Sequence, residues 1–153
     1  MKKNQGFSLV ELIGVIAIMA VLVGVLAPAY LRYVEKSRKS TDVSSISDIL
    51  AAAEKVAIDP QFDLAAGAKF TLSGSGSSLG MAVTNGSTDA AADAALAEWK
   101  AIAGDGYVCK SKEFKAATFS FEGTLQTTGS VSWSISAAEI IAFSPDFDNK
   151  WSS

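Results

Sequence analysis

Charged residues are absent from one long stretch near the start of the chain. Residues 12–31 carry no charge, and about 20 apolar residues are enough to cross the hydrocarbon core of a bilayer. Beyond this stretch the apolar residues recur at intervals of three and four, which is helical spacing, until Pro60 interrupts the pattern. The pattern therefore predicts one helix over residues 7–58, transmembrane in 7–31 and amphipathic in its second half.

The length of this helix decides what can surround it. At 1.5 Å per residue it would extend on the order of 75 Å, which a domain of about 100 residues cannot bury. Its first half must therefore lie in lipid or against other copies of itself. Pro28 lies inside the predicted helix, where it removes one backbone hydrogen bond and loosens the rod. Gly14 and Gly24 weaken the helix further and allow neighbouring helices to approach closely.

The remaining residues, 59–153, alternate polar and apolar positions and are rich in Ser, Thr, Gly and Ala, as expected of a globular head outside the membrane. We expect a loop and helix region in 59–106 and antiparallel strands in 107–143. Within the first of these regions the pattern predicts three features in order: a strand at 69–72, a turn at 74–78 and a helix at 88–103.

Alternation with a period of two marks the last third of the chain. It predicts strands at 117–122, 130–135 and 139–143, with Gly123 and Gly129 bracketing the turn between the first two. The tail beyond the third strand is polar apart from two aromatic residues. Together with the long helix, these strands predict an α+β fold.

Composition argues against several classes of function. The chain has no histidine, so the usual general base, metal ligand and pH switch are missing. The formal net charge of −3 does not favour a nucleic-acid partner. A basic cluster that can contact lipid head groups or acidic neighbours follows the apolar run: Arg32, Lys36, Arg38 and Lys39. The single cysteine, Cys109, cannot form an internal disulfide, and its apolar neighbours predict that it is buried.

The most informative segment stands at the start of the chain. Two lysines precede a Gly6-Phe7 junction, and Glu11 follows four residues later, where the apolar run begins. This segment closely resembles the class III signal of type IV prepilins and pseudopilins, and the resemblance covers residues 1–35. It implies that a prepilin peptidase cuts between Gly6 and Phe7, releasing a leader of residues 1–6, and that the new amine of Phe7 is methylated.

The details of the segment resemble one class of pilins more than others. The short leader, Phe7 and Glu11 are similar to the type IVa class. The chain lacks the pair of C-terminal cysteines that many Gram-negative pilins carry. In that respect it is more similar to the pilins of Gram-positive bacteria, and no disulfide-bounded receptor loop is implied.

Physical chemistry supports this resemblance in part. Glycine before the cut lets the protease approach an extended backbone without a Cβ atom in the way, and Lys2 and Lys3 favour a cytoplasmic N-terminus. The basic cluster beyond the apolar run opposes that orientation when positive charges are simply counted. The orientation therefore rests on the resemblance, together with the rule that long domains translocate largely regardless of charge.

The resemblance implies a type IV pilin fold, in which a long N-terminal spine helix packs on a small antiparallel β-sheet head. It implies a precursor held in the cytoplasmic membrane, then a subunit of an extracellular helical filament built from many copies. The implied partners are prepilin peptidase, the pilus assembly platform and minor pilins. Such a subunit catalyses no reaction, and whether the fibre serves motility, adhesion or DNA uptake stays open.

Three residues are candidates for assembly. We expect Glu11 to pair with the Phe7 ammonium of a neighbouring subunit and so to fix the axial register. A carboxylate at the bilayer centre costs roughly 2.5–3.5 kcal/mol, but near the end of the span it costs less and the helix N-terminus favours it. Pro28 is expected to be a hinge. The simpler alternatives are that Glu11 is an interfacial glutamate, that Phe7 is an apolar anchor residue and that Pro28 is a neutral break in the helix.

Two other functions stay open at this point. A pseudopilin of a type II secretion or DNA-uptake apparatus resembles pilins in its N-terminal segment, and major pseudopilins bind calcium in a C-terminal loop. This makes Asp146 and Asp148 candidate calcium ligands, although calcium takes six to eight oxygens and a solvated acidic tail is the plainer reading. No other cofactor is expected. The third reading, a signal-anchored extracellular enzyme, is opposed by the missing histidine.

Overall fold

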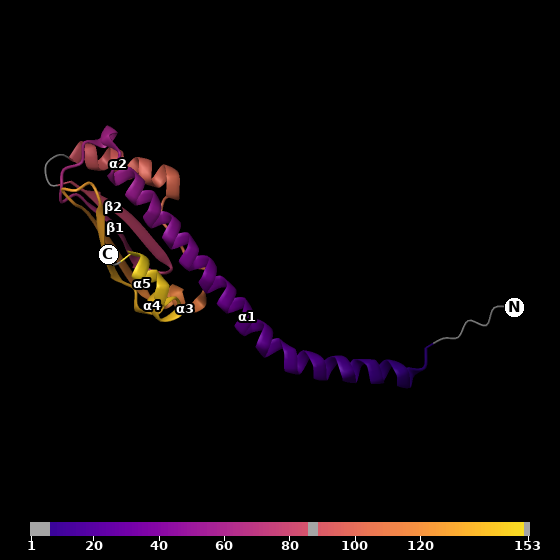
Figure 1. Ribbon diagram of the computed structural model, residues 1–153. Coiled ribbons are helices and arrows are strands. Elements are labelled where there is room, and N and C mark those ends of the chain that lie inside the picture. Colours follow the sequence, from indigo (N-terminus) through magenta and orange to yellow (C-terminus); the bar gives the residue numbers. More distant parts are fainter. Residues whose placement is uncertain (1–6, 86–88, 152–153) are drawn as a thin grey trace. The chain divides into compact units, whose positions relative to one another are not determined.

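The computed structural model describes residues 7–85 and 89–151. The chain divides into two compact units, the first ending at Ser37 and the second beginning at Arg38. Helix α1 (Leu9–Ala57) contributes to both units, and every other helix and strand of the described residues lies in the second (Figure 1). The two units are described separately below.

Helix α1 confirms the single long helix predicted from the sequence. Its buried residues recur at intervals of three and four, and all of them come from the second unit: Asp42, Ile46, Ile49, Leu50, Ala52, Ala53, Val56 and Ala57. This spacing places them on one stripe of the helix, which packs into the core. Residues 9–31, by contrast, are exposed without interruption. After α1 the chain turns into a short 3-10 helix, Pro60–Phe62.

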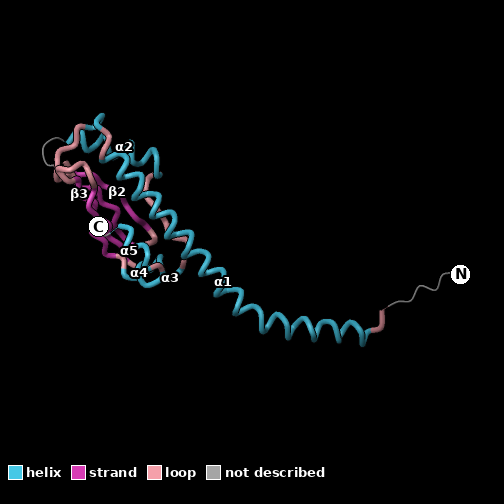
Figure 2. Tube along the Cα trace, viewed as in Figure 1, coloured by secondary structure: helices cyan, strands magenta, loops and turns pink. Residues whose placement is uncertain are grey.

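The second unit is built on a four-stranded antiparallel sheet with strand order β2-β1-β3-β4. Figure 2 shows the strands in magenta. The strands are β1 (Lys69–Ser75), β2 (Ser78–Thr84), β3 (Thr118–Leu125) and β4 (Val131–Ser136). Aromatic and aliphatic side chains fill the inner face, whereas the outer face carries mainly serine, threonine and charged residues. This division follows from the period of two along each strand. The predicted α+β fold is confirmed.

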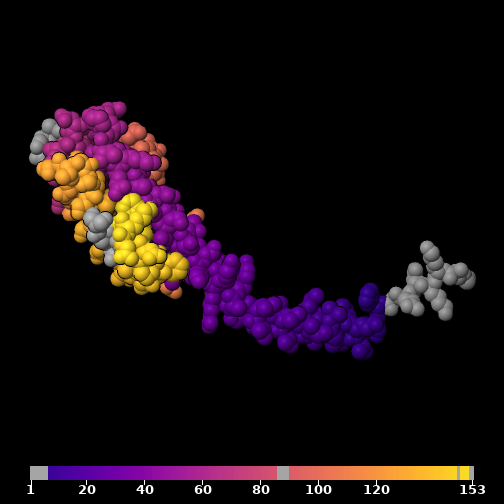
Figure 3. All heavy atoms as spheres, viewed as in Figure 1, coloured from indigo at the N-terminus to yellow at the C-terminus, as the bar shows by residue number. Residues whose placement is uncertain are grey.

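Besides α1, four further helices are described in the second unit. They are α2 (Asp89–Ala103), α3 (Lys112–Ala116), α4 (Ala138–Phe143) and α5 (Pro145–Trp151). The prediction of α2 is confirmed, whereas α3 was not expected. In Figure 3 the C-terminal residues, drawn in yellow, lie against α1, and Lys150 Nζ donates to Ser47 Oγ of α1 at 3.0 Å.

The predicted strand at 139–143 is wrong, because these residues form helix α4. A short apolar run does not distinguish a strand from a buried helical turn by its period alone. Here only Ile140 of this helix is buried, and one inward side chain in a six-residue helix is the pattern of a single helical face. The tail that follows is helical as well, and its two aromatic residues, Phe147 and Trp151, are buried in the core.

A turn joins β3 to β4 as predicted, but it begins later than expected, because Gly123 lies inside β3 and pairs with Trp133 of β4. A Cβ atom at position 123 would lie 2.9 Å from Cη2 of the Trp133 ring. The glycine therefore leaves the space in which the indole ring lies. A glycine inside a strand often marks such a close approach.

We expect Gly123→Ala to destabilise the second unit by about 1–3 kcal/mol, because overpacking a filled site costs this much. Gly80→Ala is the matched control, since a Cβ atom there would meet only Ser73 O, at 3.9 Å. Urea unfolding of the full chain in detergent, followed by tryptophan fluorescence, measures both. Equal midpoints for the two variants would show that the Trp133 ring moves aside without cost.

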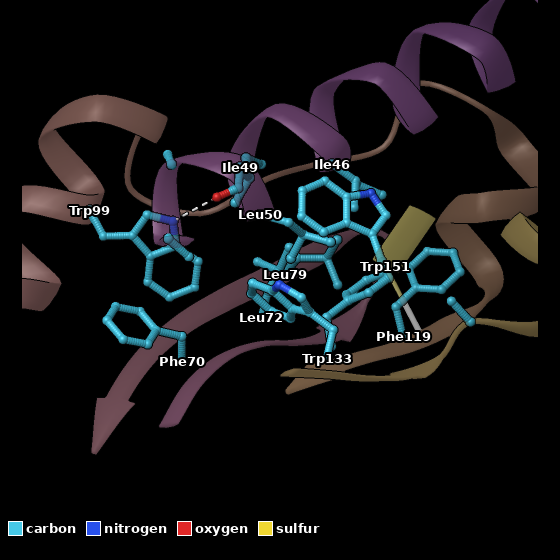
Figure 4. Close-up of a cluster of buried hydrophobic side chains, with 14 of the residues drawn as sticks. Ile46, Ile49, Leu50, Phe70, Leu72, Leu79, Trp99, Phe119, Trp133 and Trp151 are labelled. Atoms are coloured by element: carbon cyan, nitrogen blue, oxygen red, sulfur yellow. Dashed lines mark hydrogen bonds between the residues drawn. The ribbon is translucent and has the colours of Figure 1, made fainter. Parts of the chain in front are cut away.

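Tryptophan side chains connect α2 and β4 to helix α1, and α5 to β4. Trp99 Nε1 of α2 donates to the backbone oxygen of Ile49 at 2.9 Å (Figure 4), and Trp133 Nε1 of β4 donates to Glu54 Oε1 at 3.0 Å. Trp151 of α5 packs edge-on against Trp133, with ring centroids 5.9 Å apart. The core of the second unit thus forms around the second half of α1.

Candidate functional site

Helix α1 begins directly after Ser8, and Glu11 lies in its first turn. The backbone N–H of Ser8 donates a hydrogen bond to Glu11 Oε2 at 2.8 Å. This contact is one half of a capping box, in which a glutamate at the third helical position accepts from the N-cap N–H. The pattern Ser-x-x-Glu ahead of an apolar run is the signal of this motif, and the sequence prediction missed it.

The carboxylate of Glu11 therefore has a partner within its own chain. The free N–H groups and the partial positive charge of a helix N-terminus stabilise a carboxylate at this position, which lowers the cost of placing it at the edge of an apolar segment. Phe7 precedes the cap and is 94% exposed. The two residues lie at the same end of α1. Gly6, the other half of the cleavage junction, lies outside the described residues.

The apolar side chains of residues 9–31 form the largest exposed hydrophobic surface among the described residues. Helix α1 is long and apolar enough to span a membrane, and no part of its most apolar window is buried within the chain. Gly14 and Gly24 have no atom within 4 Å of the position that a Cβ would occupy. No described residue fills the space beside either glycine, so both positions leave room for the close approach of another molecule.

Pro28 lies within α1 as predicted, and the helix continues through it. Proline has no N–H, so it cannot donate the helical hydrogen bond to the carbonyl of residue i−4, which here is Gly24. The backbone is therefore one hydrogen bond short at a point where glycine already weakens it. The hinge role of Pro28 stays a prediction.

The basic cluster is partly engaged within the second unit. Lys39 forms an ion pair with Glu113, and its Nζ lies 5.7 Å and 5.6 Å from the ring centroids of Phe114 and Phe143. Arg38 also interacts within the chain. The Lys39 contacts attach the start of the second unit to α3 and α4.

A buried carboxylate that the sequence indicated only as an acidic neighbour of the basic cluster holds the segment after α2. Asp42 of α1 is fully buried. Its Oδ1 accepts from the Tyr107 hydroxyl and from the Lys110 backbone N–H, each at 2.8 Å, and its Oδ2 accepts from the Ser111 N–H at 2.8 Å. The hydrogen bonds satisfy both carboxylate oxygens, as a buried charge requires. This Asp42 cluster connects helix α1 to a segment more than 60 residues away in the chain.

Cys109 lies inside this segment and is buried, which confirms the prediction. Burial, with the nearby Asp42 carboxylate, raises the pKa of the Cys109 thiol to about 12. Burial also raises the pKa of Tyr107 to about 12; the hydrogen bond with Ser45 opposes this increase, and Asp42 adds to it. A thiol is a nucleophile only as thiolate, so Cys109 is inert at neutral pH.

We expect Cys109 to resist alkylation by iodoacetamide at pH 8 in the folded chain and to react once the chain is unfolded in urea. Rapid labelling of the native chain at pH 8 would contradict the buried position.

The raised pKa values also predict a loss of stability at high pH. In the folded chain the pKa values of Cys109 and Tyr107 lie above their ordinary values of 9.0 and 10.0, so the unfolded chain releases these protons at a lower pH than the folded chain. The free energy of unfolding therefore falls as the pH rises from about 9 toward 12.

The candidate calcium ligands lie on helix α5 rather than in a loop. Asp146 is exposed, and the side chain of Asp148 lies outside the described part of the structure. Among the described residues no group of three or more His, Cys, Asp or Glu side chains is placed to hold a metal ion. Calcium binding at these two positions stays a prediction.

Comparison with known proteins identifies the first part of the chain. Residues 1–27 match the family model of the prokaryotic N-terminal methylation motif. No curated protein sequence and no solved structure matches the chain. The matched residues include the Gly6-Phe7 junction, Ser8 and Glu11, together with most of the exposed apolar surface.

Proposed function

We propose that this chain, which carries the class III signal of type IV pilins and pseudopilins and has a type IV pilin-like α+β fold, is a subunit of an extracellular type IV pilus. One observation carries the proposal: the methylation motif leads into an exposed apolar helix, and the same helix continues into a folded unit. Motif and fold favour a structural protein over an enzyme.

Processing is the first step of this proposal. Prepilin peptidase cuts between Gly6 and Phe7, and the new Phe7 amine is methylated. The precursor is anchored by residues 9–31 in the cytoplasmic membrane, with Lys2 and Lys3 on the cytoplasmic side. Removing the leader leaves an N-terminal ammonium directly before the cap of α1.

Assembly is the second step. Burying a Val, Leu or Ile side chain from water is worth about 1.5–3 kcal/mol, so residues 9–31 cannot be left in water when the subunit leaves the bilayer. Packing against the same segment of other copies replaces lipid contact with protein contact. That exchange involves little hydrophobic gain, so close van der Waals packing must drive it. Gly14 and Gly24 allow the close approach that such packing needs.

Two residues direct this packing. Glu11 pairs with the Phe7 ammonium of a neighbouring subunit, which sets the axial register as each copy enters the filament. The pair forms where both groups leave water, so its electrostatic attraction is stronger than at a surface. Pro28, one hydrogen bond short in the helix, lets the rod bend or locally unwind as it packs.

A pseudopilin of a secretion or DNA-uptake apparatus is the alternative, because the methylation motif is shared by both classes. A pilus subunit is also expected to bind the assembly platform and minor pilins.

Electron microscopy of the cell surface, with antibodies against the second unit, distinguishes a pilus subunit from a pseudopilin. Long labelled fibres that disappear in a peptidase-deficient strain support the pilus. Labelled protein that never leaves the envelope as long fibres supports the pseudopilin and overturns the proposal.

A further inference from the structure

Basic side chains gather around helix α3 in the second unit. Arg38 and Lys39 of α1 stand at the start of this unit, and the ion pair between Lys39 and Glu113 holds α3 beside them. The backbone N–H of Lys110 donates to the buried Asp42 side chain at 2.8 Å, which brings the segment before α3 to the same part of α1. The basic α3 surface formed in this way consists of Arg38, Lys39, Lys110, Lys112 and Lys115.

The exposed charge of this surface is positive. Lys110, Lys112 and Lys115 are exposed, and the last two are three residues apart, which places them on one face of α3. The carboxylate of Glu113, on the same helix, already has its partner in the α1 lysine. The Asp42 carboxylate is buried, and both of its oxygens accept hydrogen bonds. The two acidic residues within the surface are therefore engaged inside the chain.

The rest of the second unit has the opposite charge. The sequence of this unit contains nine Lys and Arg residues and 14 Asp and Glu residues, although the basic α3 surface holds five of the nine. Of the remaining four, Lys69 and Lys100 form ion pairs with Glu122 and Asp105. Helix α4, which packs beside α3, adds one exposed carboxylate, Glu139. The unit is therefore an acidic body with a basic surface around α3.

The covalent chain keeps this surface near the bilayer. Only residues 32–37 separate the charge-free run, residues 12–31, from Arg38 at the start of the second unit. A chain extends at most about 3.3–3.6 Å per residue, so Arg38 stays within about 25 Å of the end of that run in any arrangement of the two units. When residues 9–31 span a membrane, the second unit is thus tethered through the same surface that carries its positive charge.

We propose that the basic α3 surface binds the phosphate groups of anionic phospholipids in the membrane that anchors the precursor. Such lipids increase the bound population roughly fivefold for each basic residue near the bilayer. The attraction falls off within a Debye length of about 8 Å, so it needs the short tether. The acidic remainder of the unit is repelled by the same lipids, which leaves this surface as the favoured side for contact.

The tether favours lipid over the acidic residues of a second copy as the partner. The bilayer is within reach of the surface as soon as the precursor is inserted, whereas a second copy arrives only by diffusion or assembly. The lipid contact requires a membrane-anchored precursor but no fibre. It therefore goes beyond the proposed pilus function and applies equally to a pseudopilin.

Lysine acetylation of the full-length precursor in nanodiscs tests this contact. The discs hold one chain each, in phosphatidylcholine alone or mixed with phosphatidylglycerol, and mass spectrometry follows each lysine after brief treatment with N-hydroxysuccinimide acetate. We expect phosphatidylglycerol to slow acetylation of Lys110, Lys112 and Lys115 at least about threefold. Lys55, an exposed lysine of the same unit outside this surface, is the control and should not change. In about 1 M salt, where the Debye length is about 3 Å, the difference should disappear.

Charge reversal gives a second readout. Lys110→Glu combined with Lys115→Glu is expected to abolish the protection of Lys112 by phosphatidylglycerol, whereas Lys55→Glu is expected to preserve it. The hydrogen bond to Asp42 comes from the backbone N–H of residue 110, so the double substitution leaves that contact in place.

Three results would overturn the lipid contact. The first is an equal rate of acetylation in the two lipids, and the second is an equal slowing at Lys55. The third is protection that appears only in fibres and without phosphatidylglycerol, which would assign the surface to a second copy. A chain that does not co-purify with the nanodiscs would instead refute the membrane anchor itself, so the two failures are distinguishable.

Discussion

Replacing Glu11 with alanine is expected to reduce filament assembly at least tenfold while precursor insertion and cleavage continue. In the proposed filament the Glu11 carboxylate faces the Phe7 ammonium of a neighbour, away from water. Removing one partner of a desolvated charge pair costs about 2–5 kcal/mol, and each 1.4 kcal/mol is a tenfold change in affinity. Filament yield by electron microscopy and leader cleavage by immunoblot are the measurements.

The hydrogen bond from Ser8 to Glu11 makes a sharper comparison possible. Glutamine at position 11 can still accept from the Ser8 N–H, since a capping box uses either Glu or Gln, but it carries no charge. If Glu11 acts through the ion pair, Glu11→Gln should fail to assemble as Glu11→Ala does. If Glu11→Gln assembles normally and only Glu11→Ala fails, the residue acts as a helix cap and the pairing proposal is wrong.

Asp42→Ala is expected to destabilise the second unit by at least about 3 kcal/mol, because it removes three hydrogen bonds to a carboxylate and each is worth about 1.5–3 kcal/mol. The substitution leaves three donors without acceptors: the Tyr107 hydroxyl and the backbone N–H groups of Lys110 and Ser111. Each unsatisfied buried donor costs about 1–3 kcal/mol. Thermal unfolding of the full chain in detergent, followed by tryptophan fluorescence, measures the loss.

Asp48→Ala is the control for the Asp42 prediction. Asp48 is an exposed aspartate on the same helix, and surface substitutions of this kind change stability by about 0.5 kcal/mol or less. An Asp42→Ala chain that unfolds at the same temperature as Asp48→Ala would show that water replaces the carboxylate and that the cluster is not a source of stability.

Much of the fold follows from periodicity in the sequence. The charge-free run and the three-and-four spacing beyond it located α1, because both patterns persist over many turns. Strands β3 and β4 were located by alternation. Strand β2 also alternates, with Leu79, Met81 and Val83 facing inward, but Gly80 and Ala82 between them are poor strand formers and hide the signal.

Other features depend on contacts that a linear pattern does not contain. The alternation does not show that the turn begins after Gly123, because the Trp133 ring that needs the space beside Gly123 lies on another strand. Asp42 looked like one more polar residue in the helix, since its partners lie 65 to 69 positions away. The Ser8–Glu11 cap was readable from the sequence, because its two residues are only three positions apart.

The central claim is that one apolar helix first anchors a precursor and then, once its leader is removed, becomes the shared core of a fibre. The most direct measurement is the mass and the first residue of the chain released from fibres sheared off the cell surface. The account predicts a chain that begins with N-methylated Phe7. A chain in these fibres that still carries residues 1–6 would contradict it.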